Sequence, residues 1–122
     1  MSDRRQRLGK LGEDLAAQRL AARGYRVLDR NWRCPEGELD IVAEKDGVLV
    51  LVEVRTRRGD RFGTPEESIT PTKRAKLLEV AQAYLDDHNA ADRDWRIDVV
   101  AIEIGPRGEV ARFEHIENAI EE

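Results

Sequence analysis

The stretch Gly37–Arg57, GELDIVAEKDGVLVLVEVRTR, constrains the fold of this chain more than any other. Two runs of strand-forming residues flank Asp46-Gly47, and Asp-Gly between alternating hydrophobic residues is a strong signal for a two-residue β-hairpin. With Asp46 and Gly47 at the centre of the turn, Lys45 faces Val48. Each further step away from the turn then pairs the next residue of one strand with the next residue of the other, so the turn predicts the register of both strands.

The predicted register places Asp40 opposite Glu53, and Glu38 opposite Arg55. Like charges that face each other on a sheet are destabilising, so the two carboxylates need a compensating positive charge. A divalent cation would supply it, because Mg²⁺ and Mn²⁺ prefer oxygen ligands. Asp40, Glu53 and the backbone carbonyl of Val54 therefore form a predicted metal site.

The run Val48–Val54 (VLVLVEV) is apolar on both faces until Glu53. This pattern is typical of a central strand that is covered on two sides, and it predicts an α/β sandwich around a mixed sheet. We expect a helix from about Leu8 to Arg23 that ends at Gly24, strands near Tyr25–Arg30, Glu38–Glu44 and Val48–Thr56 with a loop over Asn31–Gly37, a helix from Pro71 to about Asp87 with Thr70 as N-cap, and strands near Arg96–Ile104 and Val110–Ile116.

The first predicted helix has one broad apolar stripe, and Glu13 lies at the edge of that stripe rather than on the opposite face. If this helix packs on the sheet near Asp40, Glu13 contributes a third carboxylate to the predicted site. The stripe consists of Leu8, Gly12, Leu15, Ala16, Leu20 and Ala22.

The bulk properties favour one globular domain over residues 1–122, with 40% hydrophobic and 38% charged residues. No apolar run approaches the roughly 18 residues of a transmembrane helix, and the basic N-terminus is not followed by the apolar segment of a secretory signal. The single cysteine, Cys34, excludes an internal disulfide. We therefore expect a cytoplasmic protein without a membrane partner.

The charge is unevenly distributed, although the formal net charge is −4. Basic residues gather in residues 1–12 and 54–76, whereas residues 103–122 are acidic. A polyanion such as DNA would prefer the two basic regions, although runs of charge are also common on ordinary solvated faces. The candidate nucleic-acid contacts next to the predicted metal site are Arg55, Arg57, Arg58, Arg61 and Lys73.

Several short motifs distributed over nearly the whole chain are specific when taken together. They are Gly12-Glu13, Ala16-Ala17, Gly24-Tyr25, Arg30-Asn31, Gly37–Ala43 (GELDIVA), Val52–Arg57 (VEVRTR), Lys73, Tyr84-Leu85 and Asp98-Val99-Val100. With these motifs the chain resembles a bacterial family known as YraN-like proteins, uncharacterised protein family 0102. The order of elements, with a carboxylate on the second strand and Glu-x-Arg on the third, also resembles the PD-(D/E)XK nuclease superfamily, which includes branched-DNA resolvases and type II restriction enzymes.

The resemblance implies a restriction-endonuclease-like αβββαβ core and a Mg²⁺- or Mn²⁺-dependent endonuclease that acts on DNA, with branched and single-stranded substrates both open. It implies that Asp40 and Glu53 are metal ligands and that Glu13 is the helix carboxylate of the catalytic site. Arg55 stands where the superfamily usually has its catalytic lysine. Because resolvase-like enzymes often act as dimers, the resemblance also leaves a homodimer open.

The arginine at position 55 keeps a second hypothesis open. Lysine can lose its proton when it is desolvated, whereas arginine stays charged and is a poor general base. Arg55 therefore also fits a non-catalytic nucleic-acid-binding accessory protein that keeps the nuclease fold. In the blandest interpretation, Glu38, Arg55 and Arg57 form a structural charge network with Asp40 and Glu53. Metal-dependent cleavage of DNA would exclude both alternatives.

Overall fold

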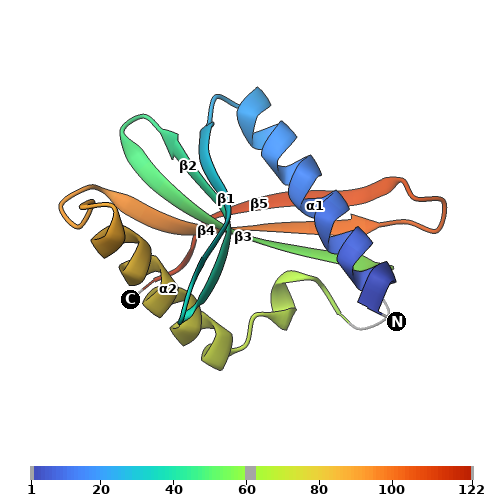
Figure 1. Cartoon of the computed structure of the whole chain (residues 1–122). Coiled ribbons are helices and arrows are strands. Elements are labelled where there is room, and N and C mark those ends of the chain that lie inside the picture. Colours follow the sequence, from blue (N-terminus) through green and yellow to red (C-terminus); the bar gives the residue numbers. More distant parts are fainter. Residues whose placement is uncertain (1, 60–62, 122) are drawn as a thin grey trace.

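The computed structural model describes residues 2–59 and 63–121 (Figure 1). Arg61, one of the predicted nucleic-acid contacts, lies outside the described residues. The elements follow the predicted order of a helix, three strands, a helix and two strands. They are α1 (Ser2–Ala22), β1 (Arg26–Cys34), β2 (Gly37–Lys45), β3 (Val48–Arg58), the short 3₁₀ helix η1 (Glu66–Ser68), α2 (Pro71–Asp87), β4 (Trp95–Ile104) and β5 (Val110–Ile120).

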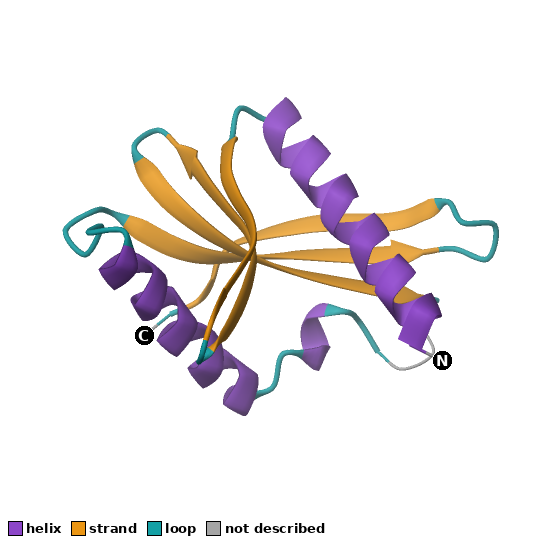
Figure 2. Cartoon of the chain, in the orientation of Figure 1, coloured by secondary structure: helices purple, strands orange, loops and turns teal. Residues whose placement is uncertain are grey.

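The five strands form one mixed sheet in the order β1-β2-β3-β4-β5, in which only the β3–β4 pair is parallel. The two long helices cover opposite faces of this sheet (Figures 1 and 2). The predicted α/β architecture with a mixed central sheet is therefore confirmed, and it is consistent with a restriction-endonuclease-like core. Within the described ranges, no helix is long and apolar enough to cross a membrane.

The hairpin between β2 and β3 has the predicted turn, and the predicted register holds next to the turn, but the predicted pairs Asp40–Glu53 and Glu38–Arg55 lie beyond the end of this ladder. Asp46 and Gly47 both have positive φ angles, of 53° and 80°, which is the signature of a type I′ turn. Pairing begins at Lys45–Val48 and continues in step to Ile41–Val52. There it stops, whereas β1 and β2 stay paired as far as Cys34–Gly37. The end of β1 and the beginning of β2 consequently diverge from β3 (Figure 1).

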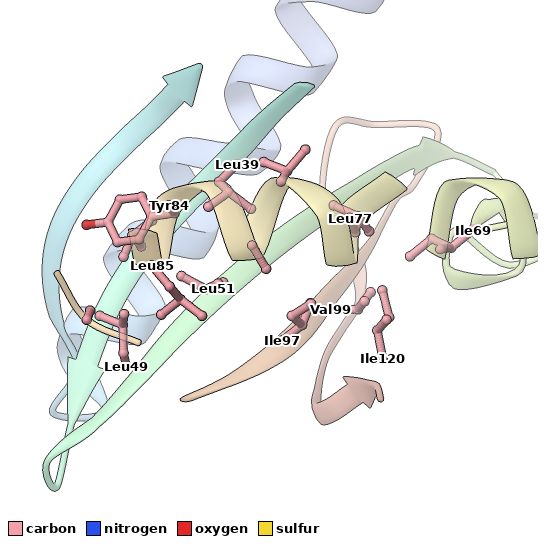
Figure 3. Close-up of a cluster of buried hydrophobic side chains, with 14 residues drawn as sticks. Leu39, Leu49, Leu51, Ile69, Leu77, Tyr84, Leu85, Ile97, Val99 and Ile120 are labelled. Atoms are coloured by element: carbon pink, nitrogen blue, oxygen red, sulfur yellow. The ribbon is translucent and has the colours of Figure 1, made fainter. Parts of the chain in front are cut away.

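Each face of the sheet has its own hydrophobic core. Helix α2 begins as predicted, with Thr70 as the N-cap whose hydroxyl accepts the Lys73 N–H at 3.2 Å, and with Pro71 in the first turn. Leu77 and Leu85 of α2 pack on the sheet in the cluster that Figure 3 shows. The core under α1 contains Ala16, Leu20, Tyr25, Ile41, Ala43, Val50, Val52, Val100, Ile102 and Ile104.

Glycine at position 12 lets α1 approach β3 closely. A Cβ atom built on Gly12 would lie only 1.8 Å from Oγ1 of Thr56, so any larger residue would push the helix and the strand apart. Gly9, one turn earlier in the helix, has no such neighbour within 4 Å. The close approach at Gly12 fixes the position of the next residue, Glu13, over the sheet.

Three predicted boundaries are wrong. Helix α1 begins at Ser2 rather than near Leu8, and β5 continues past Ile116 to Ile120. The predicted loop Asn31–Gly37 is mostly strand, because β1 stays hydrogen-bonded to β2 up to the turn at Pro35-Glu36. Ala22, predicted to face the core, is exposed in the last turn of α1.

Candidate metal centre

Strand β2 loses its regular alternation at Asp40. Leu39 packs in the core under α2 and Ile41 in the core under α1, although residues two apart on a regular strand point to the same face. On the neighbouring strand, the register places Asn31 beside Asp40, and Asn31 has a positive φ of 54°. Oδ2 of Asp40 accepts the backbone N–H of Val54 at 2.8 Å. The carboxylate therefore lies between β2 and β3, at the point where the two strands separate.

The Asp40 carboxylate takes the place of a backbone partner. In a ladder continued beyond Ile41–Val52, the next pair to exchange hydrogen bonds would be Leu39 and Val54. Val54 instead donates its N–H to the aspartate. Because the N–H and C=O groups of one strand residue point to the same neighbouring strand, the Val54 carbonyl belongs to this opening as well. The role of this carbonyl as a backbone ligand stays a prediction.

Four acidic side chains from three elements meet at this opening. Carboxylate oxygens of Glu13 from α1 and of Glu38 and Asp40 from β2 lie within 4.8 Å of one another. Glu53 from β3 is hydrogen-bonded to Asp40. We call Glu13, Glu38, Asp40 and Glu53 the carboxylate cluster. Glu38 was not among the predicted ligands, although its spacing of two from Asp40 on one strand was a usable signal.

On the α2 side of the sheet, the cluster borders a small cavity with basic walls. Glu53 forms an ion pair with Arg55, in which Nη2 and Oε2 are 2.7 Å apart. The cavity has a volume of about 180 Å³, and Glu38, Glu53 and Arg55 line it together with Lys73 and Lys76 of α2. The structure thus brings together predicted contacts that are distant in the sequence.

Burial and mutual repulsion raise the pKa values of the clustered acids. For Asp40, burial and then the negative charge of Glu53 raise the pKa to about 8, against the opposing effect of the Val54 N–H. Burial also raises the pKa of Glu53, although Arg55 and the hydrogen bond with Asp40 oppose this change. The pKa of Glu13 is raised by burial and then by Asp40 and Glu38. The raised pKa of Asp40 therefore favours its protonated form, which can donate a hydrogen bond to Glu53.

This donor set fits a divalent cation. Two buried carboxyl groups that lie close together are stabilised by a proton between them, and a metal cation can take the place of that proton. Mg²⁺ and Mn²⁺ are bound by such oxygen ligands. Two members of the cluster already have cationic partners: Nε of Arg33 pairs with Oε2 of Glu38 at 2.7 Å, and Glu53 pairs with Arg55. The buried Nε of Arg55 has no hydrogen-bond partner within the described part of the chain.

The predicted site residues do not all come together. Asp40, Glu53, Glu13, Arg55 and Lys73 surround the opening between β2 and β3, with the Val54 backbone between them. Arg57 and Arg58 lie further along β3, beside the first turns of α1. The predicted cations therefore separate into a group at the carboxylate cluster and a group at the far end of β3.

A second buried aspartate, Asp98 on β4, has a very different environment. Its side chain is 0% exposed, and it accepts hydrogen bonds from Nε of Arg96 at 2.9 Å, from the N–H of Asn118 at 2.9 Å and from Nε2 of His115 at 2.7 Å. Burial raises the pKa of Asp98, but these three hydrogen bonds outweigh it and the net pKa is lowered. The set Arg96, Asp98, His115 and Asn118, called the Asp98 network below, includes a histidine whose contacts the sequence did not indicate.

Comparison with known proteins identifies the family. The model of the Uncharacterised protein family UPF0102 matches residues 12–102. A UPF0102 protein of Roseiflexus castenholzii is 55% identical over 123 residues, which cover 100% of this chain and 99% of the relative. This chain belongs to the UPF0102 family. Other UPF0102 proteins include that of Moorella thermoacetica, 46% identical over 98% of this chain and 99% of its own, and that of Dictyoglomus turgidum, 39% identical over 92% and 95%.

The region that matches the UPF0102 model contains the whole carboxylate cluster, because it starts at Gly12 and runs to Ile102 in β4. It also includes Arg55 and Lys73, which line the neighbouring cavity. The candidate metal centre thus lies within the part of the chain that defines the UPF0102 family.

Proposed function

We propose that this UPF0102 protein is a Mg²⁺- or Mn²⁺-dependent endonuclease of the PD-(D/E)XK superfamily that hydrolyses phosphodiester bonds in branched or single-stranded DNA. The observation that supports the proposal most strongly is the buried carboxylate cluster at the point where β2 leaves β3. Burial and the charge of Glu53 raise the pKa of Asp40 to about 8, and burial raises the pKa of Glu53 despite its ion pair with Arg55. Clustered acids with strongly raised pKa values are more common at functional sites than in structural ion pairs.

In this proposal Asp40, Glu53 and the Val54 carbonyl hold the cation, and Glu13 supplies a further carboxylate from α1. A cation bound to such ligands lowers the pKa of a coordinated water and neutralises charge that develops on the phosphate. Glu38 lies close enough to Asp40 to bind either the cation or its water shell. The cluster thereby restricts the cation to the opening between the strands.

Arg55 binds and orients the phosphate in this proposal. Its guanidinium is next to Glu53, and a guanidinium can donate two parallel hydrogen bonds to phosphate oxygens. Because arginine keeps its proton, Arg55 cannot remove a proton from the attacking water. Lys73 and Lys76 line the same cavity from α2 and add positive charge on the side where the substrate would enter.

The second candidate is a nucleic-acid-binding accessory protein without catalytic activity. The ion pair between Arg55 and Glu53 favours it, because a guanidinium already compensates one of the carboxylates and reduces the need for a cation. In this case the basic residues would bind DNA and the carboxylate cluster would have no catalytic role.

Cleavage assays separate the two candidates. Purified protein is incubated with single-stranded, duplex and four-way-junction DNA in Mg²⁺, Mn²⁺ or EDTA, in parallel with Glu53→Gln. Glu36→Gln, which changes an exposed glutamate in the β1–β2 turn, is the matched control. We expect metal-dependent cleavage by the wild type and by Glu36→Gln but not by Glu53→Gln. Binding without cleavage in every metal would instead support the accessory protein.

A further inference from the structure

A second basic surface lies at the other end of β3 from the cavity that contains Arg55. Arg4, Arg5, Arg7 and Leu8 from the first turns of α1 and Arg58 from the end of β3 line a concave surface with a volume of about 580 Å³. We call this surface the arginine groove. In Figure 1 the beginning of α1 lies beside the end of β3, which explains how residues distant in the sequence line one surface.

The charges of the arginine groove are not balanced by the described part of the protein. Among residues 2–59 and 63–121, no ion pair joins Arg4, Arg5, Arg7 or Arg58 to a carboxylate. Arg7 donates to the Asp3 carbonyl oxygen at 3.4 Å, and Arg58 donates to a carbonyl oxygen at 3.5 Å. Several arginines elsewhere in the structure do have carboxylate partners: Arg26, Arg30, Arg33, Arg55, Arg93, Arg96 and Arg112. Arg19 and Arg23 instead lie over the ring of Phe113, and Arg74 donates to the carbonyl oxygen of Ala119.

Like charges that are gathered without counterions repel one another, so a polyanion is the ligand that would relieve this repulsion. The unpaired N–H groups in the first turn of α1 carry partial positive charge at the same end of the groove. The protein as a whole has a net charge of −4, so the groove is a local concentration of positive charge rather than part of a generally basic surface.

The arginine groove continues toward the candidate metal centre. A second hollow of about 450 Å³ shares Arg5, Leu8 and Arg58 with the groove and extends it to Thr56 and Arg57. Arg58 is five residues beyond Glu53 on β3, which corresponds to about 16 Å at ~3.3 Å per residue. One strand of a DNA duplex carries a phosphate about every 3.4 Å, so this distance spans about five nucleotides.

We propose that the arginine groove binds the phosphodiester backbone of DNA about five nucleotides from the bond that is cleaved. Arginine suits this role because its planar guanidinium matches phosphate oxygens and stays charged. The groove would bind the substrate at a distance from the cleaved bond, and it would set the length of flanking DNA that the protein needs for cleavage. The binding of DNA to the groove is independent of the proposed function, whereas the relation to the cleaved bond rests on it.

Binding measurements with a matched control test the groove itself. The variant Arg4→Gln/Arg5→Gln removes two charges from exposed helix positions, and glutamine is also a good helix former. The control Arg26→Gln/Arg107→Gln removes two charges from exposed positions elsewhere. The dissociation constant for a fluorescently labelled DNA duplex is measured in EDTA over a series of salt concentrations, with Arg58→Gln as a second variant in the groove.

We expect the double variant in the groove to bind roughly tenfold more weakly than the control. The slope of the logarithm of its binding constant against the logarithm of the salt concentration should be smaller in magnitude by about two, since each lost phosphate contact reduces this slope by roughly 0.9. Arg58→Gln should reduce the slope by about one. Equal affinities and slopes for the groove variants and the control would overturn the proposal.

Cleavage of shortened substrates tests the distance. Wild-type cleavage should become slower when one flank of the substrate is cut to fewer than about five base pairs, whereas Arg4→Gln/Arg5→Gln should respond little to the same shortening. An equal response of both proteins would show that the groove does not contact that flank. If the wild type cleaves no substrate, the proposed function fails, and the salt series still decides whether the groove binds DNA.

Discussion

Asp40 and Asp98 are both buried in the same sheet, with exposed fractions of 8% and 0%, but the side chains around them carry opposite charges. Asp98 accepts hydrogen bonds from two basic side chains and one backbone N–H. Asp40 accepts one backbone N–H and otherwise faces three further acids, Glu13, Glu38 and Glu53. The pKa of Asp98 is consequently lowered, whereas that of Asp40 is raised to about 8.

The comparison teaches that burial alone does not mark a functional acid. The Asp98 network provides enough donors for its carboxylate, so it joins β4 to β5 without any ligand. In the carboxylate cluster Arg33 and Arg55 pair with Glu38 and Glu53, whereas Asp40 accepts only the Val54 N–H and lies beside further acids. We propose this arrangement, and not the Asp98 network, as a cation site.

The largest expected effect is the loss of DNA cleavage when Asp40 is substituted. Asp40→Asn should slow metal-dependent DNA cleavage by at least about 100-fold, because a metal ligand contributes several kcal/mol to the stabilisation of the transition state. Initial rates at saturating Mn²⁺ measure this change. Asparagine keeps an oxygen that can accept the Val54 N–H, so folding should be preserved. A variant that cleaves as fast as the wild type would place catalysis outside the carboxylate cluster.

The second prediction concerns stability. Asp98→Ala should lower the free energy of unfolding by about 3 kcal/mol, because it leaves Arg96 and His115 without their buried acceptor. Urea denaturation followed by circular dichroism measures the loss. Asp92→Ala, at an exposed position, is the control and should change stability by less than about 0.5 kcal/mol. A loss as small as that of the control would mean that the Asp98 network does not stabilise the sheet.

The third prediction is a difference in pH dependence without metal. The folded-state pKa of Asp40 lies above its unfolded value, so its contribution to stability is fully present below the ordinary pKa of 3.8 and is lost as the pH rises toward about 8. For Asp98 the sign is reversed, because a lowered pKa gives stability above 3.8 that is lost as the pH falls through the folded-state pKa.

In EDTA near pH 8, the free energy of unfolding of Asp40→Asn should therefore exceed that of the wild type by about 2 kcal/mol, which urea denaturation measures. Near pH 4 the two proteins should differ little. Adding Mn²⁺ should raise the stability of the wild type and have less effect on the variant. A wild type that is equally stable across this pH range would contradict the raised pKa of Asp40.

The smallest expected effect tests how Glu13 reaches the carboxylate cluster. Gly12→Ala should destabilise the protein by about 1–2 kcal/mol, since the new Cβ would meet Oγ1 of Thr56 at 1.8 Å. It should also weaken Mn²⁺ binding, because α1 must move together with Glu13. Gly9→Ala, which meets no atom within 4 Å, should be neutral or slightly stabilising through its helix propensity. Equal effects of the two substitutions would show that the close approach at Gly12 is unimportant.

Local chemistry determines the parts of this fold that the sequence predicts well. The Asp46-Gly47 turn gives the register of β2 and β3, and Thr70-Pro71 gives the start of α2. Alternating and two-sided apolar runs identify the strands that become central in the sheet. These signals depend only on neighbouring residues, so a single sequence contains them.

The opening at Asp40 depends on contacts between distant segments, and the sequence does not reveal it. The reversal of side-chain direction between Leu39 and Ile41 occurs beside the left-handed Asn31 of another strand. Without it, Glu38 looks like an ordinary surface acid that faces Arg55. The arginine groove is also a tertiary feature, because Arg58 meets the first turns of α1 only after β3 has packed beneath the helix.

The position of β3 in the sheet has a consequence for the order of folding. It pairs with β2 through a two-residue turn and with β4 only after a long crossover that contains α2. Hairpins close within microseconds, whereas pairing between distant segments is slow. All four members of the carboxylate cluster precede this crossover, so their repulsion opposes folding before the core under α2 has formed. Mild acid or a divalent cation in the refolding buffer would therefore accelerate the early steps, and the acids that we connect with function would retard folding at neutral pH.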